Sequence, residues 1–210
     1  MSELFSIQLQ NRQQQGGDGV WLDLPTTTEQ VQVALRQIGI SSDNPQGLFI
    51  SGYFAEEEKR FAIPYNMVLA SNVDELNFLA ARLETLSAGE RAELNAALQA
   101  PQSELSSIGK ITDFPENVEY YVYLPDVRGP AQLGDYYLNR SGMVNMPEEW
   151  KGGIDTAQFG RYVAQQEQGA FTQYGYLVKS GDEWQKVHEG QPVPEEYRVL
   201  SLSLIHISEP

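Results

Sequence analysis

The sequence of 210 residues contains no cysteine and only two histidines. The lack of cysteine excludes a disulfide framework, a thiolate metal site and a cysteine nucleophile. His188 and His206 alone offer little material for a zinc enzyme or a histidine-dependent triad. We therefore expect no metal ion and no cofactor.

The chain also lacks a long apolar run and an N-terminal leader pattern. No segment approaches the roughly 18 consecutive apolar residues that a membrane-spanning helix needs. Residues 1–8 do not contain a basic region followed by an apolar stretch, so no signal peptide is predicted. We expect a cytoplasmic protein without a membrane partner.

Basic residues are few, and the charge of the chain is strongly unbalanced. Acidic residues outnumber basic ones by 29 to 14, which gives a formal net charge of -15. Such a chain repels phosphate, so it disfavours nucleic acid as a partner and favours a basic protein surface. The excess is spread along the chain: -4 over residues 1–64, -3 over residues 65–112 and -7 over residues 113–200.

Hydrophobic periodicity predicts an α+β protein of three small domains. Residues 1–64 show strand patterns at 4–10, 20–24 and 47–55, and the threonines 26–28 offer an N-cap for a helix through about residue 38. This block predicts a three-stranded sheet with one helix. In residues 65–112, Asn72 with Glu75 and Ser87 with Glu90 have the spacing of capping boxes, which predicts a helical domain.

Residues 113–200 predict a mixed α+β domain. Strand patterns at 118–124 and 169–179 alternate with helical patterns at 131–140 and 156–168, whereas residues 181–200 are too polar and too rich in proline to assign. The apolar, β-prone residues 201–210 do not match the acidic segment before them. They resemble a translated junction sequence, so we expect a non-native tail; a genuine C-terminal edge strand is the alternative.

Other patterns favour structural roles over chemistry. Gly16-Gly17-Asp18-Gly19 joins two predicted strands and contains an acid, which is typical of a hairpin turn and not of a phosphate loop. The tyrosine-rich stretches lack the interleaved Lys or Arg of a nucleic-acid platform, so packing in a core or an interface is favoured. Carboxylate pairs of a hydrolase depend on separation in space, which a sequence does not give.

An ordered series of motifs resembles the ArdA antirestriction family over roughly residues 4–178. The series comprises Trp21-Leu22-Asp23-Leu24-Pro25, Leu133-Gly134-Asp135-Tyr136-Tyr137, Ser141-Gly142, Ile154-Asp155, Phe159-Gly160-Arg161, Gly169-Ala170-Phe171-Thr172 and Gly175-Tyr176. The resemblance implies an elongated, acidic, three-domain homodimer carried by mobile elements. It further implies that the protein imitates bent DNA, occupies the DNA-binding groove of type I restriction-modification enzymes and blocks DNA binding. Because such a protein acts by occupancy, the resemblance implies no catalytic residue and a protein that is not an enzyme.

Two sets of residues are the expected sites of contact. The predicted partner-binding acidic surface comprises Glu56, Glu57, Glu58, Asp74, Glu75, Glu84, Glu90, Glu93, Glu104, Asp126, Asp135, Glu148 and Glu149. The predicted dimer interface comprises Tyr120, Tyr121, Tyr136, Tyr137 and Phe159, because aromatic residues are enriched in interfaces.

Two features depart from the family pattern, and two other functions stay open. Asn139-Arg140 stands where the family often carries acids, and residues 180–200 extend past the usual end of the pattern. An acidic binding module of a mobile element that contacts another basic protein is the first alternative. A carboxylate-dependent hydrolase is the second, and it would require a concave site with one raised carboxylate pKa.

Overall fold

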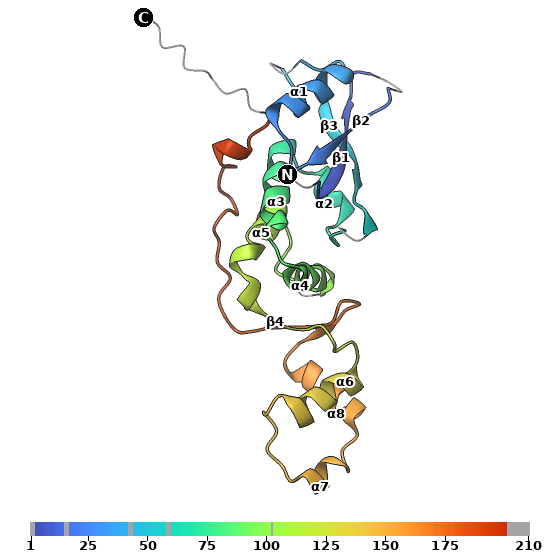
Figure 1. Cartoon of the computed structure of the whole chain (residues 1–210), viewed down its shortest axis with the longest axis vertical. Coiled ribbons are helices and arrows are strands. Elements are labelled where there is room, and N and C mark those ends of the chain that lie inside the picture. Colours follow the sequence, from blue (N-terminus) through green and yellow to red (C-terminus); the bar gives the residue numbers. More distant parts are fainter. Residues whose placement is uncertain (1–2, 15–16, 42–43, 58–59, 102, 201–210) are drawn as a thin grey trace, which may run out of the picture. The chain divides into compact units, whose positions relative to one another are not determined.

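A computed structural model of the chain describes residues 3–14, 17–41, 44–57, 60–101 and 103–200. Within these ranges the fold is mixed α/β, with eight α-helices and two antiparallel sheets of three strands each (Figure 1). The predicted mixing of helix and strand is therefore confirmed, whereas the elongated arrangement of three domains stays a prediction. The expected non-native tail at 201–210 lies outside the described residues, as does Glu58.

The chain forms two compact units that each combine distant segments. Unit 1 comprises residues 1–86, 106–115 and 186–210, and unit 2 comprises residues 87–105 and 116–185. Helices of the segment 65–112 occur in both units: α2 (Tyr65–Leu69), α3 (Val73–Glu84) and α5 (Ile108–Thr112) belong to unit 1, and α4 (Ala88–Gln99) belongs to unit 2.

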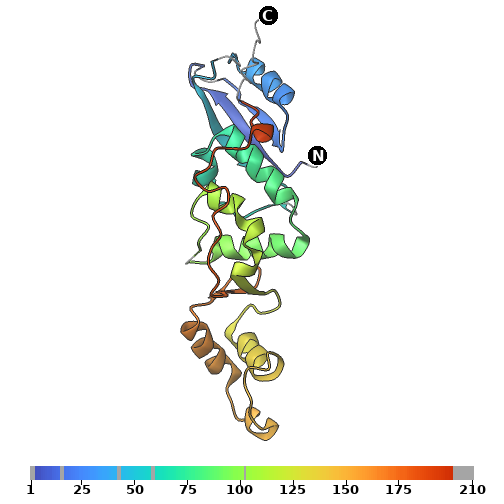
Figure 2. The same cartoon turned by 90° about the vertical axis from the view of Figure 1, so that its left-hand side faces the viewer.

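The sheet of unit 1 has the strand order β2-β1-β3, formed by β1 (Phe5–Asn11), β2 (Val20–Leu24) and β3 (Leu48–Phe54). The alternation of apolar and polar residues that predicts these strands places Ile7 and Leu9 in the core, where both are fully buried. Helix α1 (Thr28–Gln37) follows β2 and buries Val31, Ala34 and Leu35; it lies beside the sheet in Figure 2.

Reciprocal capping boxes begin three of the longer helices. Thr27 caps α1 with Gln30, Asn72 caps α3 with Glu75, and Ser87 caps α4 with Glu90. In each box a side chain accepts a hydrogen bond from a backbone N–H that has no partner within the helix. The predicted starts of α3 and α4 are confirmed. The short helix α2 carries no comparable signal, because no side-chain hydrogen bond caps it.

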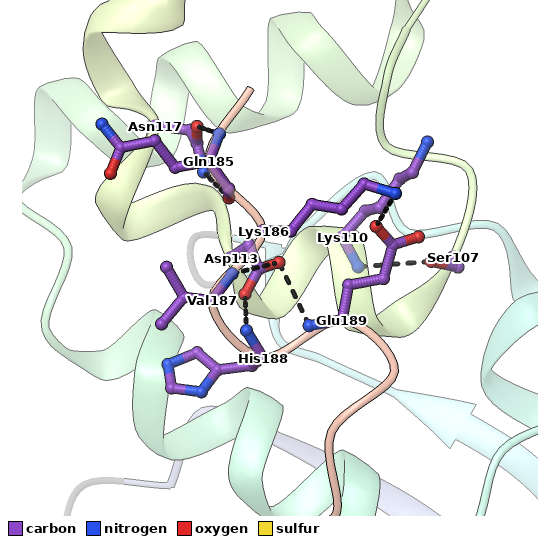
Figure 3. Close-up of polar contacts among 9 residues, drawn as sticks. All are labelled: Ser107, Lys110, Asp113, Asn117, Gln185, Lys186, Val187, His188 and Glu189. Carbon is purple, nitrogen blue, oxygen red and sulfur yellow. Dashed lines mark hydrogen bonds and ion pairs between the residues drawn. The ribbon is translucent and has the colours of Figure 1, made fainter. Parts of the chain in front are cut away.

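The segment 186–200, which has no recognisable pattern, is held in unit 1 by polar side chains. The fully buried carboxylate of Asp113 accepts hydrogen bonds from the backbone N–H groups of residues 187, 188 and 189 at 2.6–3.3 Å (Figure 3). The Asp74 carboxylate accepts two more, from the N–H groups of Val199 and Leu200 at 2.7 and 2.8 Å. The segment thus completes the core of unit 1, where Val199 is buried.

Unit 2 contains the second sheet, with the strand order β4-β6-β5, formed by β4 (Tyr121–Leu124), β5 (Ala170–Phe171) and β6 (Tyr176–Lys179). The strand predicted at 118–124 begins three residues late, because residues 118–120 form a 3-10 turn. The strand predicted at 169–179 is divided into a hairpin, where the Thr172 hydroxyl and backbone hydrogen-bond to Gly175.

The helices of unit 2 after β4 are α6 (Pro130–Asp135), α7 (Glu148–Lys151) and α8 (Thr156–Gln166), and a π-helical turn (Tyr136–Arg140) continues α6. The backbones of α6 and α8 touch where each carries a buried glycine. A Cβ atom at Gly160 would lie 1.8 Å from the carbonyl oxygen of Pro130, and one at Gly134 would lie 1.9 Å from that of Thr156. Only glycine permits this approach, so these two motif glycines are required by packing.

We predict that Gly160→Ala destabilises unit 2. The added methyl group meets a backbone oxygen that cannot turn aside, so α6 and α8 must separate, at a cost of about 1–3 kcal/mol or more in the free energy of unfolding. Denaturant titration followed by circular dichroism measures this cost. Gly152→Ala is the matched control, because its backbone conformation is helical and a Cβ atom there has no neighbour within 4 Å. Equal stability of the two variants would contradict the packing argument.

Candidate partner-binding surface

The predicted acidic residues differ in their exposure. Exposed positions are Glu56, Glu57, Asp126, Glu148 and Glu149, and partly buried positions are Asp74, Glu75, Glu84, Glu90, Glu93, Glu104 and Asp135. Unit 1 contains Glu56, Glu57, Asp74, Glu75 and Glu84, and the other described members belong to unit 2. Both units therefore present members of the set, and the set as a binding surface stays a prediction.

Three of these acids have clear roles within the fold. Asp74 fixes the backbone of residues 199 and 200. Glu75 and Glu90 close capping boxes by accepting from the N–H groups of Asn72 and Ser87. The hydrogen bonds with Ser87 lower the pKa of Glu90, so this side chain keeps its negative charge while it caps α4. Neutralising these three positions would change the fold together with the surface charge.

Other predicted acids have a basic neighbour that reduces their field. The Glu104 carboxylate lies 2.6 Å from Lys179 Nζ, and Asp135 lies 3.0 Å from the Arg140 guanidinium. Lys151 lies one helical turn from Glu148 and donates to it. Asn139 and Arg140, which stand where the family often carries acids, both donate to the Asp135 carboxylate.

Glu93 on α4 is the most perturbed carboxyl group of the predicted set. Burial raises its pKa to about 7, and the nearby negative charge of Glu90 adds to the shift. Its Oε1 atom is buried and has no hydrogen-bond partner among the described residues. Near neutral pH this side chain therefore carries only part of a charge, and it contributes less to an acidic surface than the sequence alone implies.

Several exposed acids are absent from the predicted set. Solvent-exposed carboxylates include Asp18, Glu29, Glu119, Glu183, Glu195 and Glu196. Glu29 lies in the first turn of α1, and its pKa is lowered by hydrogen bonds to the backbone and to Thr27. Charge alone could not separate these residues from the structural acids, because exposure depends on contacts between distant segments.

The predicted interface tyrosines mostly serve contacts within unit 2. Tyr120 and Tyr121 are 9% and 6% exposed and pack edge to face against each other. The hydroxyl groups of Tyr137 and Tyr176 both donate to the Glu167 carboxylate, and burial followed by this contact raises the pKa of both. Larger exposed apolar side chains of unit 2 are Val122, Met143, Trp150 and Tyr162. The predicted interface stays untested.

The part of the chain that the structure describes has neither a cluster of metal ligands nor a helix suited to a membrane. Across the described ranges, no three His, Asp or Glu side chains gather where they could hold a metal ion. Within the same ranges, no helix combines the length and apolar character that crossing a bilayer requires.

Comparison with protein families identifies the chain. The profile described as antirestriction protein (ArdA) matches residues 17–178. The chain belongs to the ArdA family. Family membership implies an antirestriction function, exercised through interaction with restriction enzymes, and places the chain among inhibitors. The comparison with curated proteins finds no match.

Three glycines of the ArdA motifs are packing positions of unit 2. Gly134 and Gly160 permit the α6–α8 contact, and a Cβ atom at Gly169 would overlap the Tyr176 hydroxyl group at 1.8 Å. The match ends at residue 178, before the segment 186–200 that completes unit 1. Residues of both units therefore lie within the matched range.

We predict that Glu93 titrates with a midpoint near pH 7 in carboxyl carbon NMR spectra. Because its pKa is raised above the unfolded value of 4.5, the folded state binds the proton more tightly. The stability that this group provides is complete below about pH 4.5 and is lost as the pH rises through about 7. In Glu93→Gln the free energy of unfolding should fall less between pH 5 and 8 than in the parent chain. Glu149→Gln, at an exposed position, should keep the parent profile; a parent-like profile in Glu93→Gln would contradict the assignment.

Proposed function

We propose that the protein is a DNA mimic that occupies the DNA-binding groove of a type I restriction-modification enzyme and thereby blocks DNA binding. The observation that carries the proposal is the surplus of carboxylates in both units. Acidic residues outnumber basic ones by 16 to 8 in unit 1 and by 13 to 6 in unit 2. Both units would therefore be attracted electrostatically to a basic groove. Inhibition by occupying that groove requires no chemical reaction.

Electrostatics explains how such a surface competes with DNA. A DNA-binding enzyme gains affinity when its Lys and Arg side chains neutralise phosphates and release counterions. Carboxylates fixed on a folded protein meet the same side chains. DNA must be deformed to fit a curved groove, whereas a folded protein already has its shape before it binds. Such recognition depends on the charge and shape of the groove and not on a base sequence.

Neutralising exposed acids without structural roles tests the proposal. Asp126→Asn, Glu149→Gln and Glu183→Gln together remove three charges from exposed positions of unit 2. Each exposed charge contact contributes under about 1 kcal/mol, so the triple variant should bind a type I methyltransferase core about tenfold more weakly than the parent. Competition against fluorescent DNA for the purified core measures this affinity.

The control keeps the charges and changes only the side-chain lengths. The variant Asp126→Glu, Glu149→Asp and Glu183→Asp should compete nearly as well as the parent. Single neutralisations should have small effects, because the interaction is distributed over many carboxylates. Complete loss of inhibition from one exposed substitution in a folded protein would contradict mimicry. Equal binding to an unrelated basic protein would favour the acidic binding module.

We also propose that the protein dimerises through aromatic residues of unit 2. Phe159 and Tyr162 lie three residues apart on α8 and therefore share a face, and Tyr162 is 60% exposed. Aromatic side chains of this kind are enriched in interfaces. Tyr162→Ser should shift the sedimentation equilibrium toward monomer at micromolar concentration. Val33→Ser, at a 49% exposed position on α1 of unit 1, should leave the dimer intact. A parent chain that sediments as a monomer would rule out the dimer.

A further inference from the structure

One face of the unit 1 sheet exposes an aromatic pair. Trp21 on β2 and Phe54 on β3 are 49% and 58% exposed, and their rings meet edge to face with centroids 6.5 Å apart. Both lie opposite polar residues of β1, since Trp21 pairs with Gln8 and Phe54 pairs with Ser6. The apolar residues that alternate with them, Ile7 and Leu22, are buried on the other face.

The indole ring of Trp21 extends across the sheet because β3 carries a glycine there. Gly52 pairs with Gln8 from the opposite side, so the three residues form one row. A Cβ atom at Gly52 would lie 3.1 Å from Cη2 of the Trp21 ring and 3.0 Å from Cβ of Gln8. The absence of a side chain at position 52 thus leaves room for the ring to lie over the strands with about half of its surface open to solvent.

Carboxylates flank this ring on the same face. Asp23 lies two residues after Trp21 on β2, and its Oδ1 accepts a hydrogen bond of 2.8 Å from the Ser6 hydroxyl. The same hydroxyl lies 3.5 Å from the Glu3 carboxylate. Among the described residues, no cation stacks on Trp21 and no basic side chain pairs with Asp23, although Arg12 does stack on the nearby Phe49 at 5.4 Å.

We propose that Trp21, Asp23 and Phe54 form a binding site for an arginine side chain of a basic partner protein. A guanidinium group is planar and weakly hydrated, so it stacks on the indole ring while its N–H groups donate to the Asp23 carboxylate. Lysine has a compact, strongly hydrated charge and gains less from the ring. The flanking carboxylates repel phosphate, which disfavours a nucleic-acid strand on this face.

The site extends the proposed function. The identity of the partner rests on that proposed function, whereas the arginine site itself does not. Phosphate imitation requires carboxylates alone, whereas this face adds an apolar surface that DNA phosphates do not offer. Aromatic residues commonly provide most of the energy of an interface, in contrast to charges at its rim. Recognition of arginine by Trp21 should therefore occur even if the natural partner is not a restriction enzyme.

NMR titration of the ¹⁵N-labelled full-length chain tests the site. The sequence has three tryptophans, and Trp21→Leu assigns the indole N–H signal of Trp21. The probe is the blocked peptide Gly-Arg-Gly-Arg-Gly, compared with its lysine and citrulline counterparts and with single-stranded oligothymidylate. We expect a saturable shift of the Trp21 signal with the arginine peptide, a smaller shift with the lysine peptide, and none with the citrulline peptide or the oligonucleotide.

Two matched controls separate this site from general attraction. Trp150, 68% exposed in unit 2, should not respond to the arginine peptide. Asp23→Asn should weaken peptide affinity about two- to fivefold, as expected for an exposed charge contact, whereas Asp18→Asn should leave it unchanged. The proposal would be overturned if Trp21 and Trp150 shifted equally with the arginine peptide, or if the citrulline peptide shifted Trp21 as much as the arginine peptide does. It would also be overturned if only the oligonucleotide shifted Trp21, or if no probe did. A negative result would leave the competition with DNA unaffected, so the two proposals fail separately.

Discussion

The fold must hold a large surplus of carboxylates with few basic residues to balance them. Like charges repel one another and destabilise a compact state, so this chain needs another source of favourable contacts for its acids. Backbone N–H groups provide it at several places. Asp113 accepts from three consecutive N–H groups, Asp74 accepts from two, and Glu75 and Glu90 each close a capping box. Through Asp113 and Asp74, carboxylate–amide hydrogen bonds thus connect distant segments of unit 1.

This constraint separates two populations of acids that look alike in the sequence. Acids such as Asp74 and Asp113 accept hydrogen bonds from the backbone within the fold, whereas Asp126, Glu149 and Glu183 are exposed to solvent. Glu93 belongs to neither group, because burial keeps it partly protonated near neutral pH. A DNA-imitating surface would consist of the exposed acids. The ArdA motif glycines Gly134 and Gly160 contribute to the fold that carries those acids in unit 2, because they let α6 and α8 pack closely.

Local patterns made much of the fold predictable. Strand alternation predicts β1, β2 and β3, and the capping signals at Asn72 and Ser87 predict the starts of α3 and α4, since both depend on neighbouring residues. Residues 186–200 could not be assigned because their order depends on Asp113, more than 70 positions away. The candidate sites were harder to predict from the sequence, because they also depend on contacts between distant residues. The Trp21 ring owes its place to Gly52 on another strand, and the exposure of each acid is a property of the folded chain.

The salt dependence of binding tests mimicry most directly. The affinity of the purified protein for a type I methyltransferase core should be measured across a salt series beside that of DNA for the same core. Because both ligands would meet the same lysines and arginines, the account predicts that the logarithm of each affinity falls as the logarithm of salt concentration rises, and that each ligand excludes the other. An affinity that does not change with salt, or simultaneous binding of protein and DNA, would contradict it.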